Sequence, residues 1–312
     1  MWFPSINFTF KTFNPKTREI FWRSIALNNF TSVATEKRSC KADNFSITYK
    51  ASTEPGFAEQ YTIAATLSKD FQVSLTISRP AAVQGFKLGT GREGGYSYFG
   101  PDQTKPDGYA VHRFWPRTSS KGLIMQAGKA IEIDGSQGIF IHAIMGMRPD
   151  NLASRWNFLY FQSRDLHGVS AVQMEFQTCS THGKSGSGSG GVRVNVGGLV
   201  VGGKLAAVTG ETHWPGVAPQ QGLEVRARAN HLDTQVDKDT GYNVPGRLSF
   251  DWAGPSIIPD ATGTVSATLE VQTNAEALLE KVDVLGEVPG VVKSVVHMTG
   301  TKPYIYQVGL PL

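Results

Sequence analysis

The sequence contains only two cysteines, Cys40 and Cys179, among its 312 residues. Two cysteines cannot build the disulfide framework that stabilises small secreted domains, and no closely spaced cysteines or histidines predict a zinc site. The two cysteines also fall in different predicted domains, so we expect both to be free thiols. Free thiols are most easily maintained in a reducing compartment.

Long apolar runs and dense charge are also missing. No run reaches about 18 consecutive apolar residues, which predicts no membrane-spanning helix, and Met1–Pro4 does not begin a signal peptide. Charged residues make up 18% of the chain, with 30 Lys and Arg against 26 Asp and Glu. This mild excess forms no dense basic stripe, so nucleic acid is not an expected partner. Weak attraction to an anionic membrane surface stays open.

Motifs of common enzymes are absent too. The chain has no Gly-x-Ser-x-Gly elbow, no His-Glu-x-x-His and no dinucleotide fingerprint, and no cofactor is expected. Side chains that could transfer protons lie on or beside predicted strands: His112, Asp134, His142 and Glu175. His142 shares a strand face with Phe140 and is either a general base in a lumen or, as we favour, a satisfied core histidine. Glu175 and Gln173 form either a buried acid site or, as we favour, an exposed strand face.

The chain is instead rich in signals for β-structure. Its length suggests about two domains of roughly 150 residues each, and 34 Gly and 16 Pro fit many turns. Phe71, Val73, Leu75 and Ile77 alternate with polar residues over one clear strand. Short alternating segments separated by turn residues predict antiparallel β-sheet in a barrel or sandwich. We place a domain boundary between residues 108 and 109, giving domains 1–108 and 109–312.

The most aromatic stretch runs from His112 to Thr178 and predicts three strands. Aromatic strands with a second, partly polar face are typical of a small barrel with a lumen. The residues that we expect to line an apolar lipid site are Trp115, Phe140, His142, Met145, Met147, Trp156, Phe158, Tyr160 and Met174. The alternative is that these side chains form a solid core. Nearby arginines (Arg113, Arg117, Arg148 and Arg155) either recognise a lipid head group or form ordinary ion pairs at the rim.

Two further segments carry local signals. Valines recur at three- and four-residue spacing from Val288 to His297, which predicts a short C-terminal helix with Pro289 in its first turn. The tract 185–191, within Gly183–Gly191, alternates Gly and Ser and predicts a flexible loop. Its regularity suggests an engineered loop replacement, and a natural Gly/Ser loop is the alternative.

Several long blocks together resemble the fungal survival-factor family, a lipocalin-like group. The blocks are His112–Arg117, Gly138–Met147, Ala153–Ser163, Ala171–Phe176, Val282–Lys293 and Thr299–Tyr306. The resemblance covers most of the chain and is strongest from Tyr98 onward. It implies two lipocalin-like antiparallel β-barrels. The family usually carries an additional N-terminal segment with a membrane-binding amphipathic helix, for which this chain has no match, so the first barrel is expected to be truncated relative to the family.

The resemblance also implies a function. The family is associated with moving ceramide between endoplasmic reticulum and Golgi, and with survival under oxidative stress. The expected protein is therefore a non-enzymatic ceramide or sphingolipid carrier in the cytoplasm, and also the nucleus, with peripheral contact at Golgi and endoplasmic reticulum membranes. Two alternatives stay open. One is a lipocalin-like enzyme, a pericyclase or hydratase that acts on a hydrophobic small molecule. The other is a stress-response scaffold that binds no small ligand.

Overall fold

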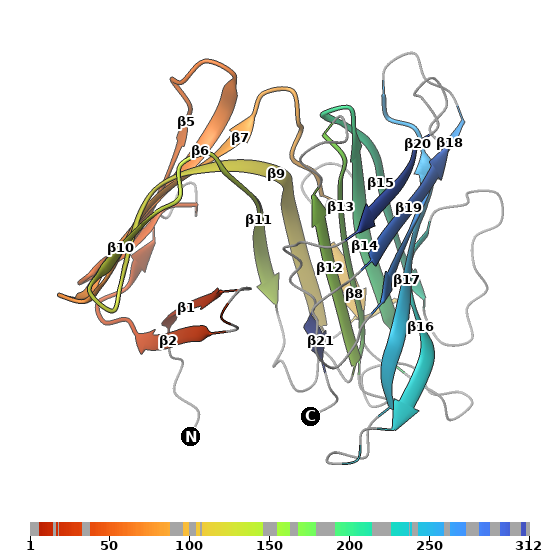
Figure 1. Ribbon diagram of the computed structural model, residues 1–312, viewed down its shortest axis with the longest axis horizontal. Coiled ribbons are helices and arrows are strands. Elements are labelled where there is room, and N and C mark those ends of the chain that lie inside the picture. Colours follow the sequence, from red (N-terminus) through yellow and green to blue (C-terminus); the bar gives the residue numbers. More distant parts are fainter. Residues whose placement is uncertain are drawn as a thin grey trace. The chain divides into compact units, whose positions relative to one another are not determined.

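The structure is a computed structural model in which every regular element of the described residues is a β-strand (Figure 1). It describes residues 6–14, 17, 19–32, 38–87, 96–99, 104–106, 108–145, 155–162, 168–178, 191–213, 226–236, 238, 243–258, 263–272, 281–287, 294–299 and 307–309. All strand pairs with a defined register are antiparallel, from the hairpin β1–β2 to the pair β19–β20. The expected all-β, antiparallel class is confirmed.

Contacts divide the chain into two compact units. Unit 1 comprises Met1–Ala82 and Arg117–Gly138, and unit 2 comprises Val83–Pro116 and Ile139–Leu312. Strand β9 (Gly108–Gln126) begins in unit 2 and ends in unit 1, and β11 (Ser136–Met145), which pairs with β9, returns to unit 2. The boundary expected between residues 108 and 109 therefore falls inside unit 2, and the chain exchanges between units at other positions.

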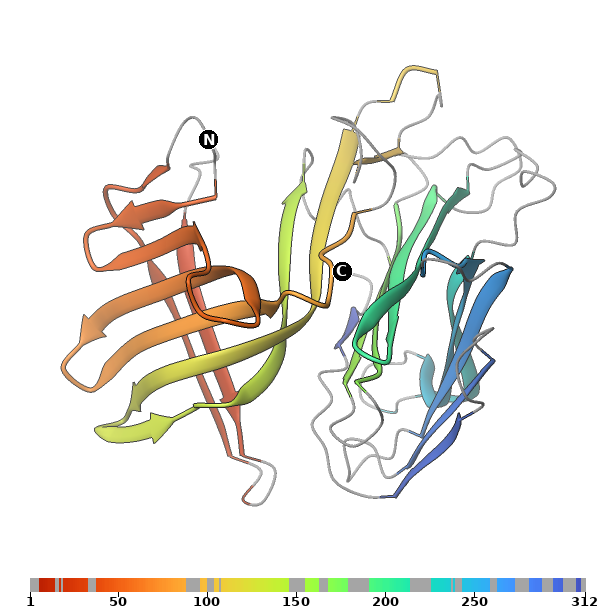
Figure 2. The same ribbon diagram turned by 90° about the horizontal axis from the view of Figure 1, so that it is seen from above.

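Unit 1 consists of a hairpin laid on a curved sheet. The hairpin is β1 (Asn7–Phe13) and β2 (Ile20–Ala26). The sheet runs in the order β10-β9-β7-β6-β5-β4-β3. Its further strands are β3 (Thr31–Ser32), β4 (Cys40–Ala42), β5 (Phe45–Ala51), β6 (Phe57–Ser68), β7 (Phe71–Pro80) and β10 (Lys129–Glu132). Figure 2 shows the hairpin in red beside the orange strands that it covers.

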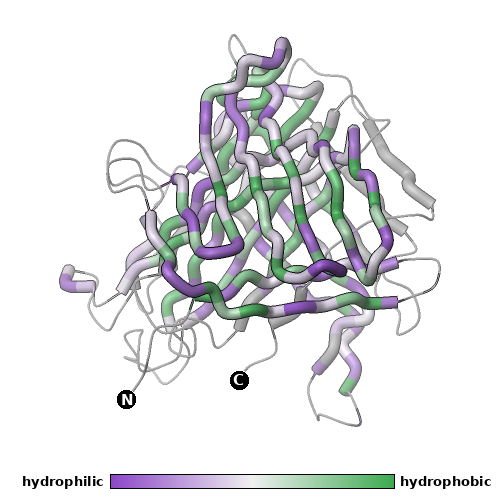
Figure 3. Tube along the Cα trace, turned by 90° about the vertical axis from the view of Figure 1, so that its left-hand side faces the viewer, coloured by the Kyte–Doolittle hydropathy of each residue, from purple (hydrophilic) through white to green (hydrophobic). Residues whose placement is uncertain are grey.

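The core of unit 1 follows the alternation that the sequence predicts. Phe71 and Val73 of β7 are buried, whereas Gln72 and Ser74 between them are exposed. The ring of Phe71 lies with its centroid 5.2 Å from that of Phe10, on the hairpin. Hydrophobic and hydrophilic segments alternate along these strands in Figure 3. Period-two patterning therefore fixes which face of the sheet the hairpin covers.

Unit 2 contains two five-stranded sheets. The first sheet has the order β15-β14-β13-β12-β21 and the second has the order β16-β17-β18-β19-β20. The first comprises β12 (Arg155–Gln162), β13 (Ser170–Gln177), β14 (Arg193–Val201), β15 (Lys204–His213) and β21 (Gln307–Gly309). The second comprises β16 (Arg226–Val236), β17 (Asn243–Pro255), β18 (Thr264–Gln272), β19 (Lys281–Glu287) and β20 (Ser294–Thr299). Strand β8 (Tyr96–Phe99) pairs with the first part of β9.

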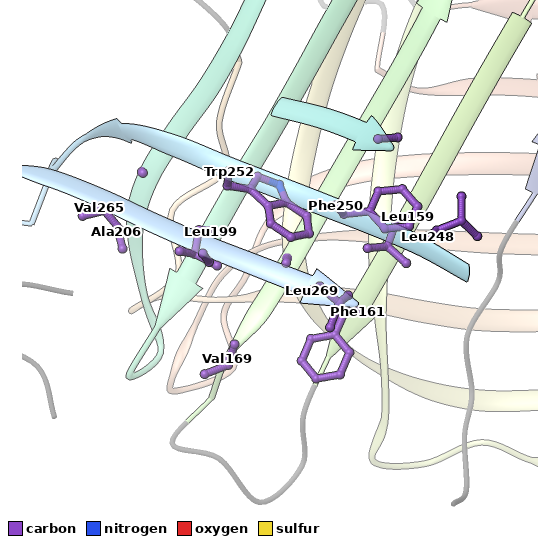
Figure 4. Close-up of a cluster of buried hydrophobic side chains, with 14 residues drawn as sticks. Leu159, Phe161, Val169, Leu199, Ala206, Leu248, Phe250, Trp252, Val265 and Leu269 are labelled. Atoms are coloured by element: carbon purple, nitrogen blue, oxygen red, sulfur yellow. The ribbon is translucent and has the colours of Figure 1, made fainter. Parts of the chain in front are cut away.

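Both faces of the first sheet are covered. On one face, Leu159, Phe161 and Leu199 pack against Phe250 and Trp252 of the second sheet (Figure 4). The other face belongs to a separate cluster around Phe114 and Phe176. The buried members of that cluster are Val83, Phe86, Ala110, Phe114, Val172, Met174, Phe176, Val192, Val194, Val196, Val200 and Leu205. The first sheet is therefore the middle layer of unit 2.

Two expectations about this architecture need correction. No strand pairing among the described residues closes any of the sheets into a barrel. The predicted helix from Val288 to His297 is also not found: residues 288–293 lie outside the described residues, and Ser294–Thr299 form β20. Val295 and Val296 pair with Leu285 and Val284 of β19. Valine favours strands, and this long-range pairing overrides the helical spacing. Residues 185–190 of the Gly/Ser tract lie outside the described residues.

Strand β14 carries two adjacent glycines whose missing side chains let two aromatic rings approach. A Cβ atom on Gly197 would lie 2.9 Å from Cδ1 and Nε1 of Trp252, and one on Gly198 would collide with the ring of Phe86. Successive strand residues point to opposite faces, so the two rings approach β14 from its two sides. The indole of Trp252 also donates from Nε1 to the backbone oxygen of Val172 at 3.1 Å.

The close approach of Phe86 predicts the effect of enlarging Gly198. Gly198→Ala should lower the free energy of unfolding by about 1–3 kcal/mol, the usual cost of overpacking a core. Denaturant unfolding measures this loss. Replacing Phe86 by Leu as well removes the far end of the ring, so the double variant should lose less than the sum of the two single losses. Strictly additive losses would show that the two positions are not in contact.

Candidate functional site

The layer between the two sheets of unit 2 encloses polar as well as apolar side chains. We call it the inter-sheet layer. On the first sheet its polar members are all buried, at most 7% exposed: Asn157, Gln173, Glu175, Asn195 and Thr209. Three of them are two residues from an apolar member of the same layer: Asn157 from Leu159, Gln173 from Ala171 and Thr209 from Ala207. Because strand side chains alternate, the polar and apolar members share one face.

Strand register arranges these side chains in three successive cross-strand rows. The apolar row is Phe161, Ala171, Leu199 and Ala207; the neutral polar row is Leu159, Gln173, Gly197 and Thr209; the third row is Asn157, Glu175 and Asn195. Along the strands, the layer therefore changes from apolar through neutral polar to acidic. This is the polarity sequence of an amphiphilic molecule, with an apolar chain at one end and a polar group at the other.

Hydrogen bonds satisfy part of the third row. His231, on β16 of the second sheet, has Nε2 2.8 Å from Oδ1 of Asn157. The amide Nδ2 of Asn157 in turn donates to Oε1 of Glu175 at 3.1 Å. With the Asn157 oxygen as acceptor, His231 carries its proton on Nε2. The chain His231–Asn157–Glu175 thus links the two sheets.

The neutral polar row is not satisfied in this way. Both polar atoms of the Gln173 side chain, Oε1 and Nε2, have no hydrogen-bond partner among the described residues, and neither does Oγ1 of Thr209. Both side chains are completely buried, with 0% exposure. An unpaired buried polar group costs about 1–3 kcal/mol. The row therefore offers an unused acceptor, an unused amide donor and an unused hydroxyl.

The burial of Gln173 and Glu175 corrects the expectation of an exposed strand face. Val172, Met174 and Phe176 do share the opposite face, as predicted, and all three are buried. The error lies in treating the remaining face as solvent-facing, since the second sheet covers it. The functional candidates Asn157, Asn195, Thr209 and His231 were missed. For Asn157, Thr209 and His231 the sequence signal is an apolar residue two positions away on the same strand face (Leu159, Ala207 and Ala229). Asn195, between Arg193 and Gly197, has no such signal.

The predicted lipid-lining residues occupy more than one place in unit 2. Phe158 and Met174 are directly opposite in register and belong to the cluster around Phe114, on the face away from the inter-sheet layer. Trp115 and Phe140 form a separate pair with ring centroids 5.0 Å apart. Tyr160, half-buried on β12, donates its hydroxyl to Oε1 of Gln162.

The remaining predicted lining residues are placed only in part. His142 is half-buried on β11. For Met145 and Trp156 the structure describes the strand but not the side chain, and Met147 lies outside the described residues. That these nine residues line a lipid site stays a prediction.

Two other acid–base candidates, Asp134 and His112, lie in different environments. Asp134 accepts a hydrogen bond from the backbone nitrogen of Gly122 at 2.7 Å, in unit 1. His112 is 5% exposed, its Nδ1 has no hydrogen-bond partner among the described residues, and its ring stacks on Phe114 with centroids 6.0 Å apart. Burial lowers the pKa of His112 from 6.5 to about 4, because the apolar surroundings disfavour the charged imidazolium. His112 is therefore a neutral core histidine at neutral pH.

The arginines and cysteines considered in the sequence analysis are only partly described. Arg117 donates from Nη2 to Oε1 of Gln137 at 3.2 Å, and Arg113 is exposed. Arg148 lies outside the described residues, and only the backbone of Arg155 is described. Cys40 is a free thiol, as expected, and burial raises its pKa. Cys179 lies outside the described residues.

The described residues include no helix that is long and apolar enough to cross a membrane. No group of three or more His, Cys, Asp or Glu side chains in this part of the chain could hold a metal ion.

Comparison with known proteins gives a consistent set of relatives. The profile of the Svf1 family matches residues 1–309. The "Ceramide-binding protein svf1" of Aspergillus fumigatus is 36% identical over 307 residues, covering 98% of this chain and 67% of that protein. The proteins of the same name from Yarrowia lipolytica and Schizosaccharomyces pombe are 31% and 30% identical, with 96% and 93% of this chain and 70% and 66% of those proteins covered. The chain thus spans about two thirds of their length.

A solved structure is also similar at a low level. Kievitone hydratase from Nectria haematococca aligns with a TM-score of 0.49 and 11% identity, covering 97% of this chain and 78% of the hydratase chain. A similarity at this level carries no argument about fold or activity.

The buried His112 predicts a loss of stability in mild acid. Its folded-state pKa is below its unfolded value, so protons bind preferentially to the unfolded chain. The free energy of unfolding should therefore be unaffected by this group above pH 6.5 and should fall between pH 6.5 and about 4. Lowering the pKa from 6.5 to about 4 corresponds to a loss of roughly 3 kcal/mol in the free energy of unfolding over this pH range.

His112→Phe should remove this contribution while keeping an aromatic ring in the cluster. Urea unfolding at pH 7 and pH 4 measures it, as the difference between wild type and variant in the pH-dependent loss. Gln235→Met, a change without a titratable group at an exposed position on β16, is the control and should retain the wild-type loss. An identical pH dependence in His112→Phe and wild type would contradict the assignment.

Proposed function

Because the chain belongs to the Svf1 family, we propose that it binds ceramide or a similar sphingolipid in unit 2 and does not catalyse a reaction on it. The name "ceramide-binding protein" of its relatives supports the ligand class. The support for the proposal from the geometry is the inter-sheet layer, which grades from apolar to polar within one buried face.

The apolar part of the inter-sheet layer suits a hydrocarbon chain. It is lined by unusually many small side chains: Ala171, Ala206, Ala207, Ala229 and Ala267. The cluster on the other face of the first sheet contains one buried alanine, Ala110. Each methylene transferred from water to an apolar site contributes about 0.8 kcal/mol. A long acyl chain lying between small side chains would therefore bind tightly without any catalytic group.

Carrier activity also fits what the acid–base candidates do. His112 stacks in an apolar cluster, Asp134 accepts from a backbone amide and Glu175 accepts from Asn157. Each has a structural partner, and this supports binding over catalysis. We further propose, on the family resemblance, that the protein moves its lipid between endoplasmic reticulum and Golgi membranes from the cytoplasm. That transfer would support sphingolipid synthesis and survival under oxidative stress.

Filling the apolar row should block the lipid. Ala207→Phe places a ring where the acyl chain would lie, so ceramide extraction from vesicles should fall at least about tenfold, which corresponds to roughly 1.4 kcal/mol of binding free energy. Extraction is measured with radiolabelled ceramide in phosphatidylcholine vesicles. The wild-type value should change little between low and high salt, because apolar burial is not screened by ions. Ala130→Phe, at an exposed position on β10, is the matched control.

Two outcomes would contradict this arrangement. If wild type extracts no ceramide, the carrier proposal fails for this chain. Phe158→Arg tests the other face of the first sheet, where the aromatic lining was predicted; Phe158 is half-buried, so the guanidinium can reach water. Loss of extraction by Phe158→Arg together with full extraction by Ala207→Phe would place the chain on that face instead.

A further inference from the structure

We propose that the neutral polar row of the inter-sheet layer, through Gln173 and Thr209, binds the polar end of the lipid, and that it selects uncharged head groups in which an amide both donates and accepts hydrogen bonds. This inference rests on the proposed function and adds the orientation and head-group class of the ligand. An amide that carries hydroxyls fits this chemistry. The apolar chain would then run toward the row of Phe161 and Leu199.

The unpaired state of Gln173 is the observation that carries the proposal. Its side chain is 0% exposed, yet both Oε1 and Nε2 are without a partner among the described residues. Thr209, in the same cross-strand row, has an unpaired Oγ1 and is equally buried. Buried polar atoms are nearly always hydrogen-bonded. One ligand with a carbonyl, an N–H group and hydroxyls would satisfy all three atoms.

The rows on either side of Gln173 and Thr209 determine the proposed orientation of the ligand. On one side, Asn157 and Glu175 of the third row are bonded to each other, and Asn157 is also bonded to His231. On the other side, Phe161, Ala171, Leu199 and Ala207 offer no polar group. Gln173 and Thr209 therefore stand at the boundary between the two environments. A polar end placed there has its chain extending over the apolar row.

The charge of the surroundings narrows the head-group class. The acidic side chain of Glu175 is 7% exposed and lies two residues from Gln173 on the same strand face. Among the described side chains, His231 of the second sheet is the further titratable group that contacts the third row, and it is already bonded to Asn157. An acidic neighbour in a poorly hydrated layer repels phosphate and carboxylate groups. Neutral amide and hydroxyl groups are thus favoured over phospholipids and free fatty acids.

A purely structural role for Gln173 predicts the opposite stability effect. If Gln173 served folding, replacing it would remove stabilising hydrogen bonds and lower Tm. If its polar atoms are unpaired until a ligand arrives, an apolar side chain of similar volume should be tolerated or preferred in the ligand-free protein. Gln173→Met makes this comparison, and Thr209→Val repeats it with an isosteric change in the same row.

The experiment measures binding of N-octanoylsphingosine and dioctanoylglycerol, together with Tm of the ligand-free protein. Dioctanoylglycerol has similar chains and one hydroxyl but no N–H donor. Gln173→Met should bind the ceramide at least about tenfold more weakly, should change dioctanoylglycerol binding less than about threefold, and should keep or raise Tm. Thr209→Val should shift both readouts in the same direction. Gln235→Met, at an exposed position on β16, is the control and should change neither.

The outcomes separate this inference from the proposed function. Wild-type ceramide binding that Gln173→Met and Thr209→Val leave intact overturns the head-group site and leaves the carrier proposal standing. No ceramide binding by wild type overturns the carrier proposal, and the Tm measurement then decides about Gln173. A Tm lowered by several degrees in Gln173→Met shows a folding role and overturns the inference, whereas an unchanged or raised Tm supports an unpaired, ligand-directed side chain.

Discussion

Burial of both faces of one sheet is the constraint on which the rest of unit 2 depends. Strands β12 to β15 lie between the second sheet and the cluster around Phe114, so most of their described side chains are buried on both faces of the sheet. Any polar residue on them must find a partner inside the protein or bear the cost of having none. The bonded chain through Asn157 and the unpaired Gln173 are the two results of that constraint. The two glycines of β14 belong to the same arrangement, because rings approach this strand from both sides.

Many of the strands could be predicted from local pattern alone. Phe71 and Val73 in unit 1, and Val172 and Met174 in unit 2, are buried as their period-two spacing indicates. Pattern fails where burial depends on a partner distant in sequence. The second sheet, which begins at Arg226, covers Gln173 and Glu175, and nothing in the sequence near Gln173 signals that cover. The helix prediction failed at Ser294 to His297 for the same reason, since pairing with β19 decides the conformation of β20.

The candidate site shows the same contrast between local pattern and packing against residues distant in sequence. Aromatic alternation drew the prediction to Phe158 and Met174, and these residues do pack together, on one face of the first sheet. The opposite face has fewer large rings and more alanines, so residue size alone makes it less conspicuous in the sequence. Its signal is the kind of side chain: along one face of β12, the polar Asn157 is followed by the apolar Leu159 and Phe161. Recognising this as a graded layer requires the register of β13 and β14, which only the structure supplies.

The placement of Trp252 gives the protein an internal optical probe. Its indole is 1% exposed, bonds the backbone oxygen of Val172 and lies against Gly197, which stands in the same cross-strand row as Gln173. Trp22, in contrast, is 55% exposed. Emission from Trp252 should therefore lie at a shorter wavelength than that of Trp22, in the same blue-shifted range as that of Trp115, which is 9% exposed and lies outside the inter-sheet layer. A molecule that enters the inter-sheet layer would change the emission of Trp252 before that of Trp115 or Trp22, so its arrival can be followed by light without attaching any label.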